Sequence, residues 1–124
     1  MPMTERIRAG KLFTDMCEGL PEKRLRGKTL MYEFNHSHPS EVEKRESLIK
    51  EMFATVGENA WVELPVYFSY GSNIHIGRNF YANFNLTIVD DYTVTIGDNV
   101  LIAPNVTLSV TGHPVHHASR KNRE

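Results

Sequence analysis

The sequence predicts a mainly β protein: a parallel β-helix of hexapeptide repeats that follows an α-helical N-terminal cap. Apolar residues recur every six positions from about residue 64 onward. Three segments of that region are near copies of one another, IGRNF at 76–80, IGDNV at 96–100 and IAPNV at 102–106. A sustained six-residue period is typical of a β-helix, whereas the apolar spacing before residue 57 is mainly that of helices.

The cap is expected to span residues 1–57. Its first helix is predicted between Thr4 and Cys17, with Thr4 as the N-cap. The Leu20-Pro21 pair marks a turn or the start of a new element. Residues 29–34 (TLMYEF) form a short apolar stretch whose type the pattern does not decide.

A second helix of the cap is predicted more clearly. Ser40 and Glu43 form an S-x-x-E capping box at its start, and Gly57 is a natural stop. Charged residues, Arg45 among them, are expected to form its solvated face. The apolar residues at helical spacing predict its buried face: Val42, Ile49, Met52, Phe53 and Val56.

The β-helix is expected to span residues 58–117, followed by a charged, disordered tail at 118–124. Three six-residue units are expected to close one triangular coil of about 18 residues. The frame slips by two residues after Tyr92. Ordinary antiparallel strands, the alternative, would instead alternate with period two. Two apolar series, four residues apart, predict the inward positions: Leu64, Tyr70, Ile76, Ala82 and Ile88, resuming at Ile96, Ile102 and Leu108; and Phe68, Ile74, Phe80, Leu86 and Tyr92, resuming at Val100 and Val106.

Composition excludes several classes of function. The formal net charge of −1 gives no reason to expect nucleic acid or an acidic membrane surface as partner. No apolar run is long enough to span a bilayer, and the N-terminus lacks the apolar core of a secretory signal. Cys17 is the single cysteine, so an intrachain disulfide is impossible and a reducing cytoplasm is the expected location.

Together with these repeats, two further segments carry a resemblance to a known family. RAGKLFTD at 8–15 resembles the helical cap of the bacterial hexapeptide-repeat maltose and galactoside acetyltransferases, and TGHPVHH at 111–117 resembles their catalytic stretch. The resemblance implies a left-handed β-helix, acetyl-CoA as co-substrate, a galactoside or related sugar as acceptor, no metal, and a homotrimer whose sugar sites lie between neighbouring subunits.

Members of that family continue beyond the position of residue 124. Their further coils make much of the acetyl-CoA site, so the cofactor-binding residues are not expected within this sequence. The chain is therefore expected to be a C-terminally truncated form with weak activity or none.

His113 is the candidate general base. A sugar hydroxyl is a poor nucleophile at neutral pH, and a histidine with a pKa near 6.5 can take its proton as it attacks the thioester. The resemblance assigns this role to His113. His116 and His117 complete a cluster of three imidazoles, for which zinc binding is the alternative.

Five further residues are candidates through the same resemblance. Asp15 and Asp91 are expected to accept hydrogen bonds from sugar hydroxyls, which suits carboxylates. Ser69 offers a hydroxyl to the sugar, and Tyr81 is expected to wall the pocket. Asn83 is assigned to catalysis and substrate binding, because its amide N–H could stabilise the developing oxyanion. Without the resemblance, Asn83 and the Asp90-Asp91 pair would be read as corner residues.

Two other functions remain open from the sequence. One is a non-catalytic β-helical module that assembles with copies of itself. The other is a metal-binding module built on the histidine cluster. Acetyl-CoA binding would separate acetyl transfer from self-assembly, and the zinc content of purified protein would test the metal-binding module.

Overall fold

The computed structural model describes residues 19–110 of the 124-residue chain. The helix predicted between Thr4 and Cys17 lies outside the described residues. Two helices come first, α2 (Leu20–Asn35) and α3 (Val42–Met52). Short strands follow: β1 (Thr55–Val56), β2 (Trp61–Val62), β3 (Val66–Phe68), β4 (Ile74–Ile76), β5 (Tyr81–Ala82), β6 (Leu86–Val89), β7 (Val94–Ile96), β8 (Leu101–Ile102) and β9 (Thr107–Ser109).

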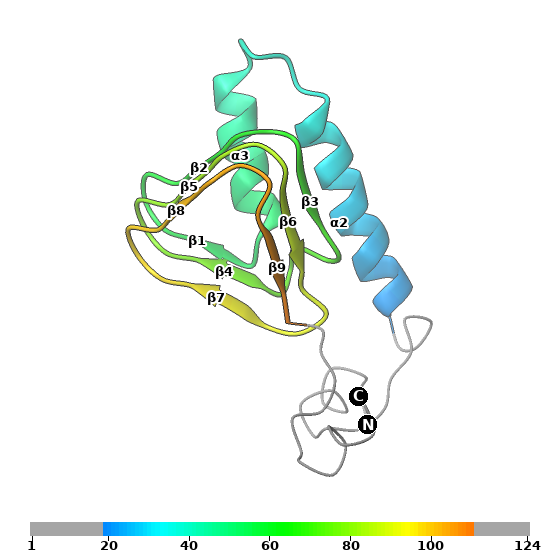
Figure 1. Cartoon of the computed structure of the whole chain (residues 1–124). Helices are drawn as coiled ribbons and strands as arrows, with labels where there is room; N and C mark the ends of the chain where they lie inside the picture. Colours follow the sequence, from blue (N-terminus) through cyan, green and yellow to red (C-terminus); the bar gives the residue numbers. More distant parts are fainter. Residues whose placement is uncertain (1–18, 111–124) are drawn as a thin grey trace.

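The strands form a triangular β-helix, which confirms the predicted fold class. Every pairing is parallel, and the three sheets have the orders β1-β4-β7, β2-β5-β8 and β3-β6-β9. Figure 1 looks along the axis of the coil, and each sheet makes one side of the triangle. The chain runs clockwise while it advances toward the viewer, so the coil is left-handed.

One coil contains 20 residues, which corrects the expected 18. Thr55 pairs with His75, and His75 pairs with Thr95, so equivalent residues lie 20 positions apart. Two extra residues enter each coil at the same corner, within 69–73 and again within 89–93. The sequence reading detected only the second of these. Leu64 and Tyr70 consequently lie in corners rather than in strands, and Tyr92 is exposed.

The predicted inward series is otherwise confirmed within the strands. In the middle coil, Ile74, Ala82, Leu86 and Ile88 are fully buried, and Ile76 and Phe80 are nearly so. The equivalent residues of the last coil are less covered, because β7, β8 and β9 are edge strands. Ile96 is 9% exposed, and Val100, Ile102, Val106 and Leu108 are only partly buried.

Two of the three corners are built by stacked asparagines. Asn59, Asn79 and Asn99 all have positive φ angles of 56–61°, a conformation that asparagine tolerates better than most residues. Their side chains form a ladder, with Asn59 Nδ2 donating to Asn79 Oδ1 at 3.0 Å and Asn79 Nδ2 donating to Asn99 Oδ1 at 2.9 Å. Asn85 and Asn105 repeat this arrangement at the second corner, at 3.0 Å.

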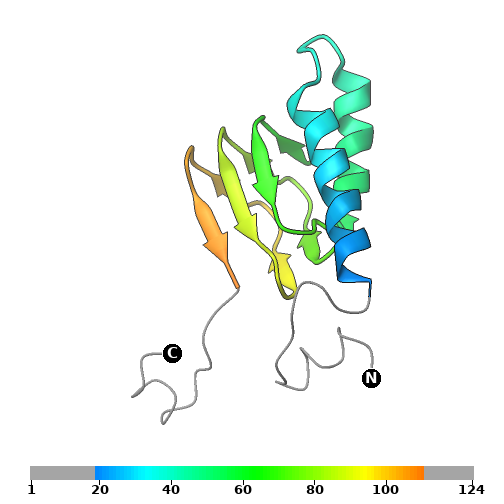
Figure 2. The same ribbon diagram turned by 90° about the vertical axis from the view of Figure 1, so that its right-hand side faces the viewer.

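The helices cover the first coil at one end of the stack (Figure 2). An uncovered edge strand would expose unpaired backbone groups, and side chains of α2 satisfy some of them. Asn35 accepts from the Val66 N–H at 2.9 Å and donates to the Val66 carbonyl at 2.8 Å. Lys28 Nζ donates to the carbonyl of Phe68 at 2.5 Å. Side chains of α2 therefore provide some of the hydrogen bonds that a neighbouring strand would provide to β3.

The start of α3 differs from the predicted capping box. The helix begins at Val42, and Ser40 makes no cap hydrogen bond. Glu41 fixes the entry instead, because its Oε1 accepts from the His38 N–H at 2.8 Å. That hydrogen bond is the main reason why the pKa of Glu41 lies below its ordinary value. The helix ends at Met52, before the predicted stop at Gly57.

The buried face of α3 also differs from the prediction, since Leu48 is buried, Phe53 follows the helix and Val56 belongs to β1. Val42 is 48% exposed, whereas Arg45 is buried. The Arg45 guanidinium lies in the loop between the helices, where Nε donates to Ser37 Oγ and Nη2 to the Ser37 carbonyl, both at 2.8 Å. Residues 29–34, whose type the sequence left open, belong to α2. No helix among residues 19–110 is long and apolar enough to cross a membrane.

Candidate functional site

The candidate site residues that the structure describes fall at two different corners of the triangle. Ser69 follows β3, and Asp91 follows β6, so both lie at the corner with the two extra residues. Tyr81 lies in β5 and Asn83 directly after it, at the corner that leads into β6. Asp15 and His113 lie outside the described residues, as do His116 and His117.

The corner that contains Ser69 and Asp91 is organised by Asp90, a residue that the sequence indicates only as part of a turn. Asp90 is fully buried. Its Oδ1 accepts from the N–H groups of Ser69 at 2.9 Å and Tyr70 at 3.0 Å, and its Oδ2 accepts from Gly71 N–H at 2.8 Å. One carboxylate from the middle coil thus satisfies three consecutive backbone donors of the coil before it. No signal in the sequence marked it, because the expected 18-residue coil does not align Asp90 with Tyr70, whereas the observed 20-residue coil does.

The electrostatics of Asp90 combine two opposing effects. Burial raises the pKa of the Asp90 carboxyl above its ordinary value, because the charged form loses its hydration. The N–H groups of Tyr70, Gly71 and Ser69 act in the opposite direction, since they stabilise the carboxylate. Asn73 also donates from Nδ2 to the Asp90 carbonyl at 2.8 Å. The corner is therefore held by both the side chain and the backbone of Asp90.

Helix α2 packs against the outside of this corner. A Cβ added to Gly27 would lie 2.1 Å from the carbonyl oxygen of Tyr70, so only glycine allows this approach. The Arg24 guanidinium lies over the Tyr70 ring, 5.9 Å from its centroid. Gly71, with φ +81°, passes close to the Met52 carbonyl, where an added Cβ would lie 2.2 Å away. The backbone that carries Ser69 is thus fixed from the cap side as well.

At the second corner, Asn83 combines a corner role with a free donor. Its Oδ1 accepts from the N–H of Phe84 at 2.8 Å, which orients the side chain. Its Nδ2 has no hydrogen-bond partner within residues 19–110, so it is available to an acceptor. Tyr81 is partly buried and points outward between Trp61 and Leu101, its partners in the sheet. Phe84 and Leu101 are 50% and 79% exposed, so this corner also presents an apolar surface.

The two corners lie at opposite ends of β6. Asn83 is three positions before Leu86, the first residue of β6, and Asp91 is two positions after Val89, its last residue. Figure 1 shows the two corners at different vertices of the triangle. One chain therefore does not bring Asn83 together with Ser69 and Asp91.

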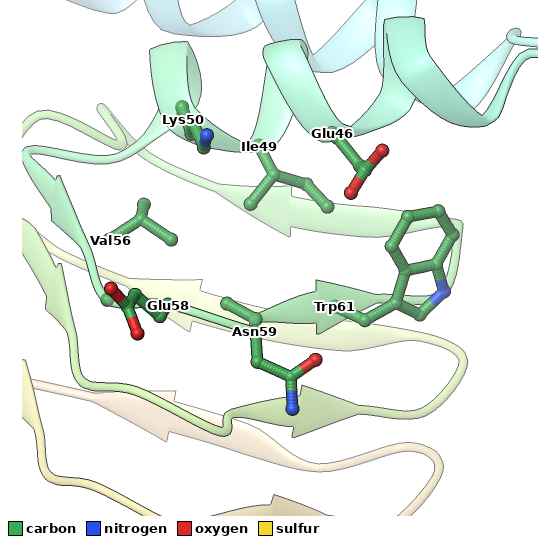
Figure 3. Close-up of a pocket in the computed structure, with 9 residues that line it drawn as sticks. Glu46, Ile49, Lys50, Val56, Glu58, Asn59 and Trp61 are labelled. Atoms are coloured by element: carbon green, nitrogen blue, oxygen red, sulfur yellow. The ribbon is translucent and has the colours of Figure 1, made fainter.

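A separate pocket lies between α3 and the first corner of the β-helix (Figure 3). Its volume is about 300 Å³, and it contains none of the candidate residues. Its lining combines charges of both signs with buried and partly buried apolar residues: Glu46, Ile49, Lys50, Val56, Gly57, Glu58, Asn59, Ala60 and Trp61. The Trp61 indole N–H is already bonded to Glu63 Oε2 at 2.8 Å. Within residues 19–110 no group of three His, Cys, Asp or Glu side chains is placed to hold a metal ion.

The comparison with protein families supports a family assignment for the cap. Residues 6–57 match the maltose acetyltransferase hexapeptide capping motif. The match covers both described helices and extends to the first strand.

Comparisons with individual proteins agree with that match. Over all 124 residues the chain is 97% identical to a galactoside O-acetyltransferase of Escherichia coli (strain K12), of which it covers 61%. A solved galactoside acetyltransferase in complex with coenzyme A is 98% identical, with a TM-score of 0.88, over 98% of this chain and 61% of the other. A hexapeptide-repeat acetyltransferase of Vibrio cholerae, solved with acetyl coenzyme A, is 27% identical with a TM-score of 0.81, over 100% of this chain and 67% of the other. The chain thus spans about three fifths of the length of the two galactoside acetyltransferases that it matches.

Proposed function

We propose a function from one premise: the chain belongs to the family of hexapeptide-repeat galactoside and maltose acetyltransferases. The proposed reaction is transfer of an acetyl group from acetyl-CoA to a hydroxyl of a galactoside. The observation that carries this proposal is the 97% identity to the galactoside O-acetyltransferase over the whole length of this chain. The coenzyme A complexes of the two solved relatives support acetyl-CoA as the donor.

In this proposal His113 is the general base. Its imidazole takes the proton of the sugar hydroxyl while the hydroxyl oxygen attacks the thioester carbonyl carbon. The carbonyl oxygen becomes an oxyanion, and Asn83 Nδ2, which has no partner within residues 19–110, is the proposed donor to it. The carbon–sulfur bond then breaks, and the proton held by His113 passes to the coenzyme A thiolate. The products are the acetylated sugar and coenzyme A.

Asp15, Ser69 and Asp91 are the proposed sugar ligands, with Tyr81 at the wall of the pocket. Ser69 and Asp91 share one corner, which supports their acting on one substrate. Asp15 lies five residues before the start of α2, the helix that packs on that corner.

The separation of the two corners supports a site shared between subunits. A sugar that contacts Ser69 and Asp91 of one chain can meet Asn83 and Tyr81 only if these come from another chain. A symmetric ring of three chains would build three such sites, since head-to-tail contacts close in cyclic assemblies. We therefore propose a homotrimer as the active form. The single cysteine supports a cytoplasmic location.

Acetyl transfer is proposed to need the part of the longer relatives that this chain does not span. The last coil presents β7, β8 and β9 as open edges with partly exposed apolar residues, which further coils would cover. Positioning of the reacting groups can lower an activation barrier by about 7–11 kcal/mol. A general base would therefore give little acetyl transfer if acetyl-CoA were not held in place.

The test measures acetyl transfer from acetyl-CoA to a simple galactoside. The 124-residue chain is compared with the same chain joined to the remaining C-terminal part of the Escherichia coli relative. We expect turnover by the joined chain and little or none by the 124-residue chain. Turnover by the shorter chain within tenfold of the joined chain would contradict the proposed need for further coils. A joined chain that assembles but neither binds acetyl-CoA nor transfers acetyl would favour a non-catalytic module.

A further inference from the structure

We propose that Asp90 is a positioning residue for the sugar site: its carboxylate holds Ser69 and Asp91, which come from adjacent coils, in one fixed arrangement. This inference rests on the proposed function, because it takes Ser69 and Asp91 as sugar ligands. Asp90 itself is fully buried and does not contact a ligand. It acts through the backbone of both neighbours.

Asp90 is connected directly to both proposed sugar-binding residues, Ser69 and Asp91. Asp90 Oδ1 accepts from the N–H of Ser69 itself at 2.9 Å, so a shift of the carboxylate moves Ser69. Asp91 is the next residue in the chain, so the same side chain anchors its backbone. The Asp90 carbonyl, which belongs to the peptide that leads into Asp91, accepts from Asn73 Nδ2 at 2.8 Å. Ser69 and Asp91 are 22 positions apart in sequence and meet through this one residue.

The other corners show that the fold does not need a buried carboxylate to turn. At the first corner, exposed asparagine amides bond from coil to coil, and the Asn79–Asn99 pair is an example. Burying a carboxylate is costly unless its oxygens are fully hydrogen-bonded, and three N–H donors are present here. Hydrogen bonds to a charged acceptor are shorter and stronger than neutral ones. The corner that carries the proposed sugar-binding residues is thus held by three hydrogen bonds to one buried carboxylate.

The corner is fixed from the opposite side by the cap. Gly27 of α2 lies against the Tyr70 carbonyl, and Lys28 Nζ donates to the Phe68 carbonyl, one residue before Ser69. The segment 68–71 is therefore held between α2 on one side and Asp90 on the other. Removing the Asp90 carboxylate would release one side only, so the fold is expected to survive while the corner shifts.

The experiment compares three variants of the chain joined to the C-terminal part of the Escherichia coli relative. Asp90→Asn keeps the size of the side chain but replaces one carboxylate oxygen by an NH₂ group, which places a donor against at least one of the three backbone N–H donors. Asn73→Ala removes one bond of the same corner. Asp98→Asn is the matched control, because Asp98 Oδ1 also accepts a backbone N–H from the preceding coil, that of Arg78 at 2.9 Å, but at a corner without candidate ligands.

A positioning role predicts a selective kinetic change. We expect Asp90→Asn to raise KM for the galactoside about 10- to 100-fold, since displacements near 1 Å have effects of that size. KM for acetyl-CoA should stay within about twofold, because the change is confined to the sugar corner. Asn73→Ala should give a smaller rise in the galactoside KM, and Asp98→Asn should leave it unchanged. Thermal unfolding of each variant separates lost binding from lost structure.

Two results would overturn the inference. One is an Asp90→Asn protein that loses stability but keeps the galactoside KM of the parent, since Asp90 would then be only structural. The other is an equal rise of KM in Asp98→Asn, since the effect would then not be specific to this corner.

A second measurement does not depend on activity. Hydrogen exchange at the amides of Ser69, Tyr70 and Gly71 in the 124-residue chain should accelerate at least tenfold in Asp90→Asn and stay unchanged in Asp98→Asn. If the joined parent chain transfers no acetyl group, the proposed function fails, whereas this exchange result still shows whether Asp90 holds the corner. Unprotected amides in the parent chain would refute the anchoring itself.

Discussion

Asn79 donates from Nδ2 to Asn99 Oδ1 at 2.9 Å, and both residues hold left-handed backbone conformations, with φ angles of 56° and 61°. The pair links equivalent corners of the second and third coils. Asn79 also accepts from Asn59 Nδ2, so it is the central member of the ladder. Asn79 thus adopts the left-handed conformation that the corner needs, and its side chain links its own coil to the coils on both sides.

Asn79→Ala is expected to lower the free energy of unfolding by about 2 kcal/mol. The substitution removes two exposed hydrogen bonds, and alanine tolerates the left-handed conformation less well than asparagine, a conformation that costs about 1–2 kcal/mol for most L-residues. Asn79→Gly is the matched control, because glycine adopts this conformation without strain and loses only the bonds. Urea unfolding followed by Trp61 fluorescence measures both. Equal losses in the two variants would show that backbone strain contributes nothing at this corner.

Gly27→Ala is expected to destabilise the chain by about 1–3 kcal/mol, the usual cost of overpacking. The new methyl group would lie 2.1 Å from the Tyr70 carbonyl oxygen, and α2 must move away. Helix propensity alone would predict the opposite, a gain of up to about 1 kcal/mol. Gly97→Ala is the control, since an added Cβ there meets no atom within 4 Å. A stabilised Gly27→Ala protein would mean that α2 does not pack as described.

The stability difference between the parent chain and Asp90→Asn should depend on pH. Burial raises the pKa of Asp90, so between the ordinary value of 3.8 and the raised value the folded chain keeps a proton that the unfolded chain has lost. The contribution of Asp90 to stability is therefore fully present below the ordinary value and falls as pH rises through this interval. Denaturant unfolding at a series of pH values measures the difference. A difference that grows with pH would show that the backbone donors outweigh burial.

His113→Ala in the joined chain is expected to lower kcat for acetyl transfer by about 10²–10⁴-fold, the usual contribution of a general base. His116→Ala and His117→Ala should have far smaller effects, because only one imidazole takes the proton. Steady-state kinetics and circular dichroism of all three variants test this together. Equal losses in the three variants, with zinc in the purified parent, would favour a metal site.

Mixing two inactive variants should restore activity if each site is shared between subunits. Asn83→Ala and Asp91→Ala, both in the joined chain, damage different corners. In a randomly mixed trimer a site takes an intact Asn83 from one chain and an intact Asp91 from its neighbour with a probability of ½ × ½, so about one quarter of parental activity is expected. Co-refolded mixtures measure this, with each variant alone as control. Activity no higher than that of the separate variants would place the whole site within one chain.

The sequence reading of the β-helix failed at one point for an identifiable reason. The corner at 69–73 contains Tyr70, which is apolar, buried and six residues before Ile76. It therefore continued the apparent period, and the two extra residues of that coil went unnoticed. Only at Tyr92, which is exposed, did the slip show in the pattern. Burial in a corner and burial in a strand look the same in a one-dimensional pattern.

In the helical region, too, the sequence pattern assigned two residues of α3 to the wrong environment. Arg45 has a charge pattern typical of a solvated face, yet the loop at Ser37 supplies acceptors for it inside the structure. Val42 has the spacing of a core residue, yet it is 48% exposed. Local pattern predicts which face of a helix is apolar, but the partners that satisfy or cover a given side chain come from elsewhere in the chain.

The sequence by itself determined the parallel β-helix and most of its inward positions, because a six-residue period is a property of the sequence alone. It also supplied the candidate residues of the proposed acetyl transfer. The tertiary structure decided which residues act together. It placed Asp90 under the backbone of Ser69, Tyr70 and Gly71, and it put Asn83 and Asp91 at different corners. Those relationships depend on the 20-residue coil, which brings residues of adjacent turns into contact, and no feature within a single turn specifies them.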